Sequence, residues 1–212
     1  MSGAAIHPDC IHAVRETAKL CADLGHVVNE AAPTFDGELL TNAFTTVWSV
    51  GCAASVEGAG FLTGHKPTAD HFEELTWILA QQGLGISGPA YLLAVNRLQA
   101  IAREVARFFA TYDIWLTPTL AEPPLPLGSF DTRPGNPLYG LHRAAAFVPF
   151  TPLCNVTGQP AMSVPLFWNA EGLPLGTHVV GRFGEEATLF RLAAQLEATR
   201  PWGARRPTTV PS

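Results

Sequence analysis

The chain has 212 residues, of which 47% are hydrophobic, and a formal net charge of −5. This composition excludes disorder over most of the chain and is sufficient for one substantial hydrophobic core. No basic run is present that would follow a phosphate backbone, and no apolar run approaches the roughly 18 residues of a membrane helix, so neither nucleic acid nor membrane is expected as a partner. The first ten residues lack the basic and apolar regions of a secretory signal, which predicts a cytoplasmic location.

Apolar residues that recur at spacings of three and four predict helices along much of the chain. The longest stripe, from Tyr91 to Phe109, predicts a helix of about 25 residues, whose other face carries charged side chains. Gly25 and Gly83 mark the ends of two of the helices. The predicted helices cover residues 7–24, 37–59, 68–83, 87–111, 138–147 and 184–197.

Short β-branched runs predict four strands, at residues 26–30, 114–118, 161–168 and 176–181. The last two form a hairpin around a turn at residues 169–172, and we expect the 161–168 strand to be covered on both faces. Strands that alternate with helices predict an α/β fold, in which this hairpin is the edge of a larger mixed sheet. Residues 121–137 predict an irregular loop.

Several residues that resemble catalytic groups are better explained by structural roles. Ser87 lies in a Gly-Ile-Ser-Gly-Pro sequence that lacks the strand and second glycine of a nucleophile elbow, so we interpret it as a helix cap. Cys154 has no neighbour that would lower its pKa, which favours a packed thiol. His65 and His71 are six residues apart, a spacing that does not place two metal ligands on one helix face. The four cysteines form no Cys-x-x-Cys pair, and we expect no metal and no cofactor.

Two predicted strand ends carry groups that can form hydrogen bonds. The end of the 114–118 strand contains Thr117 and Thr119, and the turn that precedes the hairpin contains Asn155, Thr157 and Gln159. Because strand ends in α/β proteins commonly form the floor of ligand clefts, these five residues are candidate substrate-binding residues. An equally good interpretation is that the residues of the turn satisfy only its own buried backbone groups.

Four segments resemble the C-terminal half of amidase signature enzymes. Two carry the specific motifs YDIWLTPTLAEPP (residues 112–124) and FTPLCNVTGQPAMSVP (residues 150–165), and the others are residues 172–182 and 186–196. Leu75-Thr-Trp and the long helix after it are most similar to the branch with bacterial amidases and 6-aminohexanoate cyclic dimer hydrolases. The resemblance covers nearly the whole chain. We therefore expect residues 1–200 to be the C-terminal portion of an amidase domain, followed by a flexible tail at 201–212.

This resemblance implies an α/β/α sandwich around a mixed sheet, incomplete without the N-terminal half. It also implies hydrolysis of a carboxamide by a Ser, cis-Ser, Lys triad, with backbone amides that hold the oxyanion. No catalytic residue can be assigned here, because the family's triad lies in the Gly/Ser-rich N-terminal half, and this chain has no Ser-Ser or Gly-Gly pair. Its only lysines, Lys19 and Lys66, fall in an amphipathic helix and in a loop.

The first functional hypothesis is therefore an amidase fragment, inactive alone, from a truncated gene, a misassigned start codon or a split enzyme. Its partner would be a small-molecule amide substrate once the N-terminal half completes the site. The second hypothesis is a non-catalytic remnant that binds a small ligand or another protein. The DNA upstream of Met1 would separate the two. Because half of a shared sheet exposes strand edges, we also expect self-association, misfolding or a complementing subunit.

Overall fold

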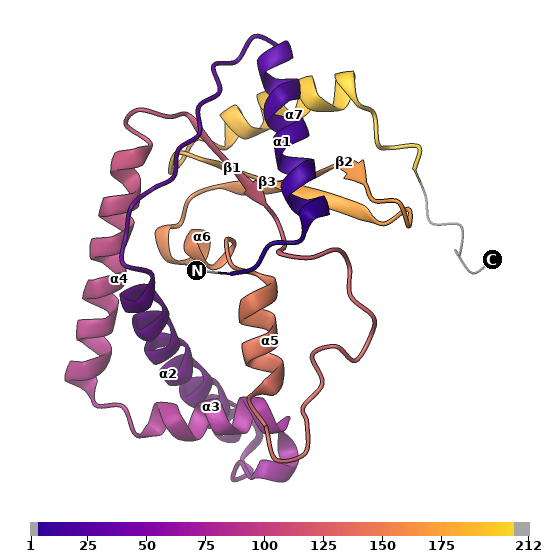
Figure 1. Ribbon diagram of the computed structural model, residues 1–212. Coiled ribbons are helices and arrows are strands. Elements are labelled where there is room, and N and C mark those ends of the chain that lie inside the picture. Colours follow the sequence, from indigo (N-terminus) through magenta and orange to yellow (C-terminus); the bar gives the residue numbers. More distant parts are fainter. Residues whose placement is uncertain (1–3, 206–212) are drawn as a thin grey trace. The chain divides into compact units, whose positions relative to one another are not determined.

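The computed structural model describes residues 4–205, which form two compact units. Within these residues, unit 1 comprises 34–105 and 126–146, and unit 2 comprises 4–33, 106–125 and 147–205. Figure 1 follows the chain through both units. The predicted tail at 201–212 lies outside the described residues from residue 206 onward.

Unit 1 is helical. It contains α2 (Gly37–Thr63), a short 3₁₀ turn (Ala69–His71), α3 (Glu74–Leu84), most of α4 (Gly88–Phe108) and most of α5 (Tyr139–Phe147). The side chain of Asp36 caps α2 by accepting a 2.9 Å hydrogen bond from the amide of Leu39, and Gly64 ends the helix in the left-handed conformation. Ser87 caps α4 by accepting from the amide of Ala90, which confirms its interpretation as a helix cap.

Helices α2 and α3 approach each other closely at one glycine. A Cβ atom on Gly83 would lie 2.9 Å from the Cβ of Ala53 and even closer to the carbonyl oxygen of Ser49. Both α2 residues are buried, as is Leu79 on α3. The small side chains of Ser49 and Ala53 therefore allow α3 to pack closely against the backbone of α2.

Unit 2 is an α/β unit. It contains α1 (Pro8–Asp23), β1 (Ile114–Pro118), α6 (Pro152–Thr157), β2 (Ala161–Trp168), β3 (Pro174–Gly181) and α7 (Glu186–Thr199). The three strands form an antiparallel sheet in the order β1-β3-β2. Asn169 closes the hairpin between β2 and β3, because its side chain accepts hydrogen bonds from the amides of Glu171 and Leu173.

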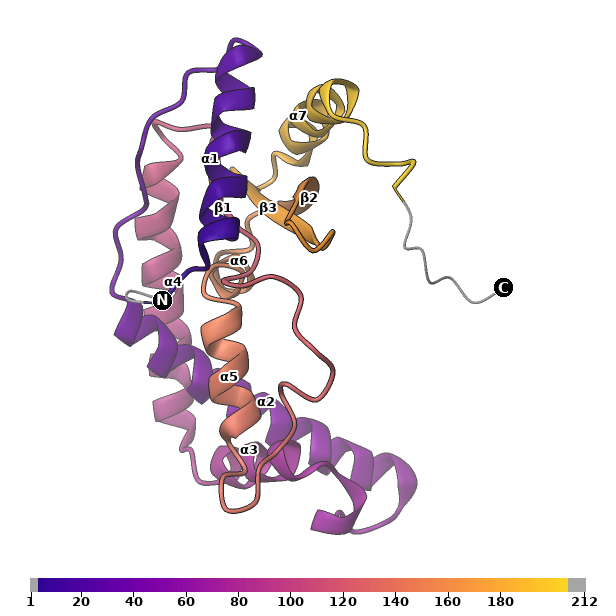
Figure 2. The same cartoon turned by 45° about the vertical axis from the view of Figure 1, so that its right-hand side comes forward.

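One face of this sheet forms the hydrophobic core of unit 2. The strand register places Leu116 beside Val179 and Val179 beside Met162 on the same face, in keeping with the two-residue period of side chains along a strand. Cys21 of α1 and Leu196 of α7 pack against this face. Figures 1 and 2 show both helices beside the sheet. Sheet and helices thus confirm the predicted α/β class.

Some sequence predictions are wrong in detail. Residues 26–30 form no strand, because no neighbouring chain pairs with them among the described residues. Strand β2 is an edge strand with Ala161 and Ser163 exposed, and β3, not β2, is the buried strand. The predicted turn at 155–160 includes the end of α6, which Pro152 begins and Gly158 ends. The third helix begins at Glu74 and not at 68, after the 3₁₀ turn.

Helix α2 is long and apolar enough, by length and composition, to cross a membrane. Its mean hydropathy reaches 1.2, and the pair α3 and α4, bent by 108°, passes the same test as one broken span. A buried helix of a water-soluble protein satisfies the same criteria, so this observation is weak support for a membrane partner. A cytoplasmic location stays a prediction.

Candidate functional site

The second face of the sheet in unit 2 is polar. The register places Thr117 opposite His178 and His178 opposite Ser163, so their side chains share this face. Thr119 lies just beyond the end of β1, where its amide donates a 3.0 Å hydrogen bond to the carbonyl of Gly176. We call Thr117, Thr119, Ser163 and His178 the polar face. It contains both of the threonines predicted from the sequence.

His178 is the buried centre of the polar face. Its side chain lies 3.1 Å from the hydroxyl of Thr117, through Nδ1, and 4.0 Å from the sulfur of Cys154, through Nε2. The residue is 4% exposed, and burial lowers its pKa to about 4. The imidazole is therefore neutral at pH 7. The sequence does not single out His178, because the register that brings it to Thr117 is not visible in the sequence.

Thr119 and Ser163 join the two outer strands over a glycine. Their hydroxyls lie 2.6 Å apart, and both belong to the exposed part of the polar face. A Cβ on Gly176 of the central strand would lie 2.7 Å from Oγ1 of Thr119 and closer still to Oγ of Ser163. Only a residue without a side chain therefore leaves room for this hydrogen bond.

We expect Gly176→Ala to break the Thr119–Ser163 hydrogen bond and to lower the free energy of unfolding by about 1–2 kcal/mol, since hydroxyls can rotate away from the new methyl group. Urea unfolding of the purified chain measures this change. Ser163→Ala removes one of the two crowded atoms, so the double variant should lose much less than the sum of the two single variants. If the losses of the two single variants simply add, crowding between the new methyl group and the hydroxyl of Ser163 is not the cause of the destabilisation.

The three candidate residues of the turn before the hairpin lie on α6 or just after it. Asn155 is exposed, Thr157 is half-buried, and the hydroxyl of Thr157 accepts a 3.4 Å hydrogen bond from the amide of Gln159. The neighbouring Cys154 faces His178, so α6 places Asn155 one residue from the polar face. Asn155 thus offers an accessible amide close to that face.

Gln159 lies elsewhere in the unit. Its side-chain amide donates a 3.1 Å hydrogen bond to the carbonyl of Gly181, whereas Thr119 binds Gly176 at the other end of β3. Five residues of strand separate these ends by about 16 Å. Gln159 is 9% exposed, and its Oε1 has no hydrogen-bond partner within the described residues. The structure therefore brings Thr117 and Thr119 to one face of the sheet, places Asn155 one residue after Cys154 on α6, and leaves Gln159 apart.

The imidazole of His178 on the polar face and the thiol of Cys154 beside it are both uncharged at pH 7. Burial raises the pKa of the Cys154 thiol to about 11, so the thiol is protonated at pH 7, in agreement with its interpretation as a packed thiol. Lys19 and Lys66 are both exposed. Across residues 4–205, no group of three or more His, Cys, Asp or Glu side chains is arranged to hold a metal ion. The polar face can donate and accept hydrogen bonds, which suits it to contact a ligand.

Comparison with known proteins identifies the class. The profile of the Amidase family matches residues 1–190, and the chain belongs to this family. Among curated relatives, the chain is 34% identical over 210 residues to the 6-aminohexanoate-cyclic-dimer hydrolase of Pseudomonas sp. (strain NK87), covering 96% of this chain and 43% of that protein. It is also 34% identical over 203 residues to the putative amidase AmiC of Mycobacterium leprae (strain TN), covering 93% of this chain and 42% of that protein.

Solved structures agree with this assignment. The structure of 6-aminohexanoate cyclic dimer hydrolase complexed with substrate is 33% identical, with a TM-score of 0.91 over 98% of this chain and 44% of that chain. The resemblance inferred from the motifs is therefore confirmed. The chain spans about two fifths of the length of these relatives and corresponds to their C-terminal part.

Proposed function

We propose that these 212 residues form the C-terminal portion of an amidase that hydrolyses small carboxamides through a Ser, cis-Ser, Lys triad outside them. The observation that carries this proposal is the combination of a family match over residues 1–190 with relatives more than twice as long. The exposure of Lys19 and Lys66, the only lysines of the chain, supports the view that the base is supplied from elsewhere.

In this proposal the chain contributes substrate contacts. Thr119, Ser163 and Asn155 are accessible and offer hydroxyl and amide groups to a bound amide. Thr117 already binds His178, which links β1 to β3 beside the accessible groups, whereas Gln159 binds Gly181 at the other end of β3. The relatives named for hydrolysis of 6-aminohexanoate cyclic dimer make this compound the first substrate to test.

We expect the purified chain alone to hydrolyse neither 6-aminohexanoate cyclic dimer nor an aryl amide above the rate of a buffer blank. Co-expression with the N-terminal portion of a 6-aminohexanoate-cyclic-dimer hydrolase should give turnover, measured by release of the amine. A serine-directed fluorophosphonate should abolish that turnover, because the proposed nucleophile is a serine.

Lys19→Ala and Lys66→Ala serve as controls, and neither should change the turnover of the co-expressed pair. Turnover by the chain alone that a fluorophosphonate abolishes would contradict the proposal. A stable pair without turnover would instead favour the second hypothesis, a non-catalytic module that retains the fold.

A further inference from the structure

Cys154 and His178 bring a thiol and an imidazole together inside unit 2. Cys154 lies on α6 and His178 on β3, and Sγ of the cysteine is 4.0 Å from Nε2 of the histidine. Cys154 is half-buried, whereas His178 is almost completely buried. The two residues are 24 positions apart, so the spacing arguments that predicted no metal from the sequence do not reveal this pair.

The hydrogen bonds of Thr117 indicate which nitrogen of His178 carries the proton. The hydroxyl of Thr117 donates a 3.1 Å hydrogen bond to the carbonyl of Pro118, and it also lies 3.1 Å from Nδ1 of His178. Because a hydroxyl has a single proton to donate, it accepts from Nδ1, and we assign the proton of the imidazole to Nδ1. The imidazole is neutral, so Nε2 keeps a lone pair, and this lone pair faces the thiol.

This arrangement of His178 is the one found in histidines that bind metal ions. Such histidines donate their other N–H to an oxygen, which fixes the tautomer and the orientation of the ring and raises its basicity as a ligand. Thr117 supplies that oxygen here, and Pro118 in turn holds the hydroxyl of Thr117. The thiol of Cys154 satisfies Nε2 poorly, because S–H is a weak hydrogen-bond donor. A buried lone pair is therefore directed at a second potential metal ligand.

The distance between the two ligands indicates the coordination geometry. With metal–sulfur and metal–nitrogen distances of about 2.3 and about 2.0 Å, ligands on opposite sides of an ion are about 4.3 Å apart, and ligands at a tetrahedral angle are about 3.5 Å apart. The 4.0 Å between Sγ and Nε2 is closer to the linear value. Within residues 4–205, no group of three or more His, Cys, Asp or Glu side chains could complete a tetrahedral site.

We propose that Cys154 and His178 bind one soft monovalent ion, of the class of Cu(I) and Ag(I), in a two-coordinate site between α6 and β3. Thiolate and imidazole are ligands that such ions prefer. The thiol releases its proton to solvent as the sulfur–metal bond forms, and Nε2 donates its lone pair, so neither oxidation nor reduction is required. The thiolate neutralises the ion, whereas a divalent ion would leave one buried positive charge.

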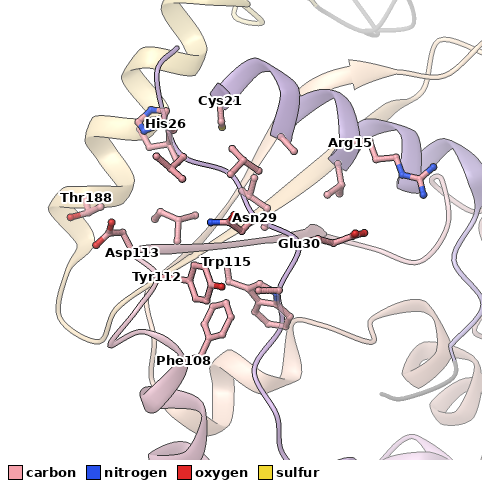
Figure 3. A pocket seen from close by; sticks show the side chains of 18 of the residues that line it. Arg15, Cys21, His26, Asn29, Glu30, Phe108, Tyr112, Asp113, Trp115 and Thr188 are labelled. Carbon is pink, nitrogen blue, oxygen red and sulfur yellow. The ribbon is translucent and has the colours of Figure 1, made fainter. Parts of the chain in front are cut away.

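Cys21 also lies near a histidine in the sequence, but it lacks this arrangement. Figure 3 shows Cys21 and His26 among the residues that line a cavity of about 1150 Å³, which neither Cys154 nor His178 lines. Nε2 of His26 lies 2.8 Å from Oε1 of Gln195, and because this oxygen can only accept, Nε2 carries the proton. His26 is also exposed, so water competes for its other nitrogen.

The test measures Cu(I) binding to the full chain without oxygen, with ascorbate to keep the ion reduced and bicinchoninate as a coloured competitor. We expect one tightly bound ion per chain, and X-ray absorption at the copper edge should show one sulfur and one nitrogen ligand. Cys154→Ser and His178→Asn each remove a ligand and should weaken binding by more than about 100-fold. Thr117→Val keeps the shape of the side chain but removes the acceptor of Nδ1–H, and it should weaken binding by about tenfold.

Cys52→Ser is the matched control. Cys52 is half-buried like Cys154, but its thiol makes no hydrogen bond within residues 4–205, so this variant should bind Cu(I) within about twofold of the parent chain. Circular dichroism checks that each variant is folded, and the absorption spectrum of the parent chain tests the ligands without any substitution.

A copper site with sulfur ligands alone would overturn the proposal, as would failure of the parent chain to retain copper against bicinchoninate. Equal binding by the parent chain, Cys154→Ser and His178→Asn would also overturn it. If Cys52→Ser lost as much affinity as Cys154→Ser, the ion would belong to thiols in general and not to this pair. Each outcome is read from metal binding, so it is independent of whether the proposed amidase function holds.

Discussion

Gly83→Ala is expected to destabilise unit 1 by about 3 kcal/mol or more, because overpacking against backbone cannot be relieved by a side-chain rotation. The new methyl group would meet the carbonyl of Ser49, which lies within α2, and the Cβ of Ala53 at 2.9 Å. Relief requires α2 and α3 to move apart, which exposes buried residues such as Leu79. The free energy of unfolding from urea titration measures the loss.

Gly51→Ala is the matched control. It makes the same substitution in α2, where the new Cβ would have no neighbour within 4 Å. Since alanine has the higher helix propensity by about 1 kcal/mol, this variant should be as stable as the parent chain or slightly more stable. If Gly83→Ala and Gly51→Ala had the same free energy of unfolding, the close approach of α2 and α3 would not limit stability.

Acidification from pH 6.5 to pH 4 should destabilise the chain through His178. Burial lowers the pKa of this residue to about 4, below the unfolded value of 6.5. The unfolded state therefore binds a proton in this window that the folded state does not bind, so stability falls as the pH falls. The full effect is about 3 kcal/mol, and it is complete below about pH 4.

His178→Asn isolates this effect from the titration of carboxylates. Asparagine keeps a polar group near the hydroxyl of Thr117, 3.1 Å from the parent imidazole, but it does not titrate. The unfolding free energy of the parent, minus that of the variant, should fall by about 3 kcal/mol from pH 7 to pH 4. A difference that is constant with pH would show that His178 titrates normally in the folded chain.

The helices were predictable because their apolar residues repeat with the helical period. Helices α1, α2 and α5 begin within about a residue of their predicted positions, since each start carries a local signal such as Pro8 or Asp36. Helix α6 was missed, although Pro152 and Gly158 mark its ends, because six residues are too few for a periodic pattern.

Three of the four predicted strands are present, two of them, Ile114–Pro118 and Ala161–Trp168, with the predicted bounds. The prediction at residues 26–30 failed because strand structure depends on partners that are distant in the sequence. Val27 and Val28 favour a strand locally, but pairing requires a second chain segment beside them. The polar face depends on the same kind of information. The register that brings Thr117 to His178 joins residues 61 positions apart. The sequence therefore indicated the threonines, but it did not indicate His178, which lies between Thr117 and Cys154 of α6.

Arg182 fixes the alignment of β1 on β3. Its Nε donates a 2.7 Å hydrogen bond to the carbonyl of Phe109, and its Nη2 lies 2.8 Å from the carboxylate of Asp113, just before β1. A shift of β1 by two residues would preserve the inward and outward faces of the strand, and hydrophobic burial alone would not oppose it strongly. Arg182 would lose both contacts in that shifted arrangement. These two contacts therefore favour a single register of β1 on β3.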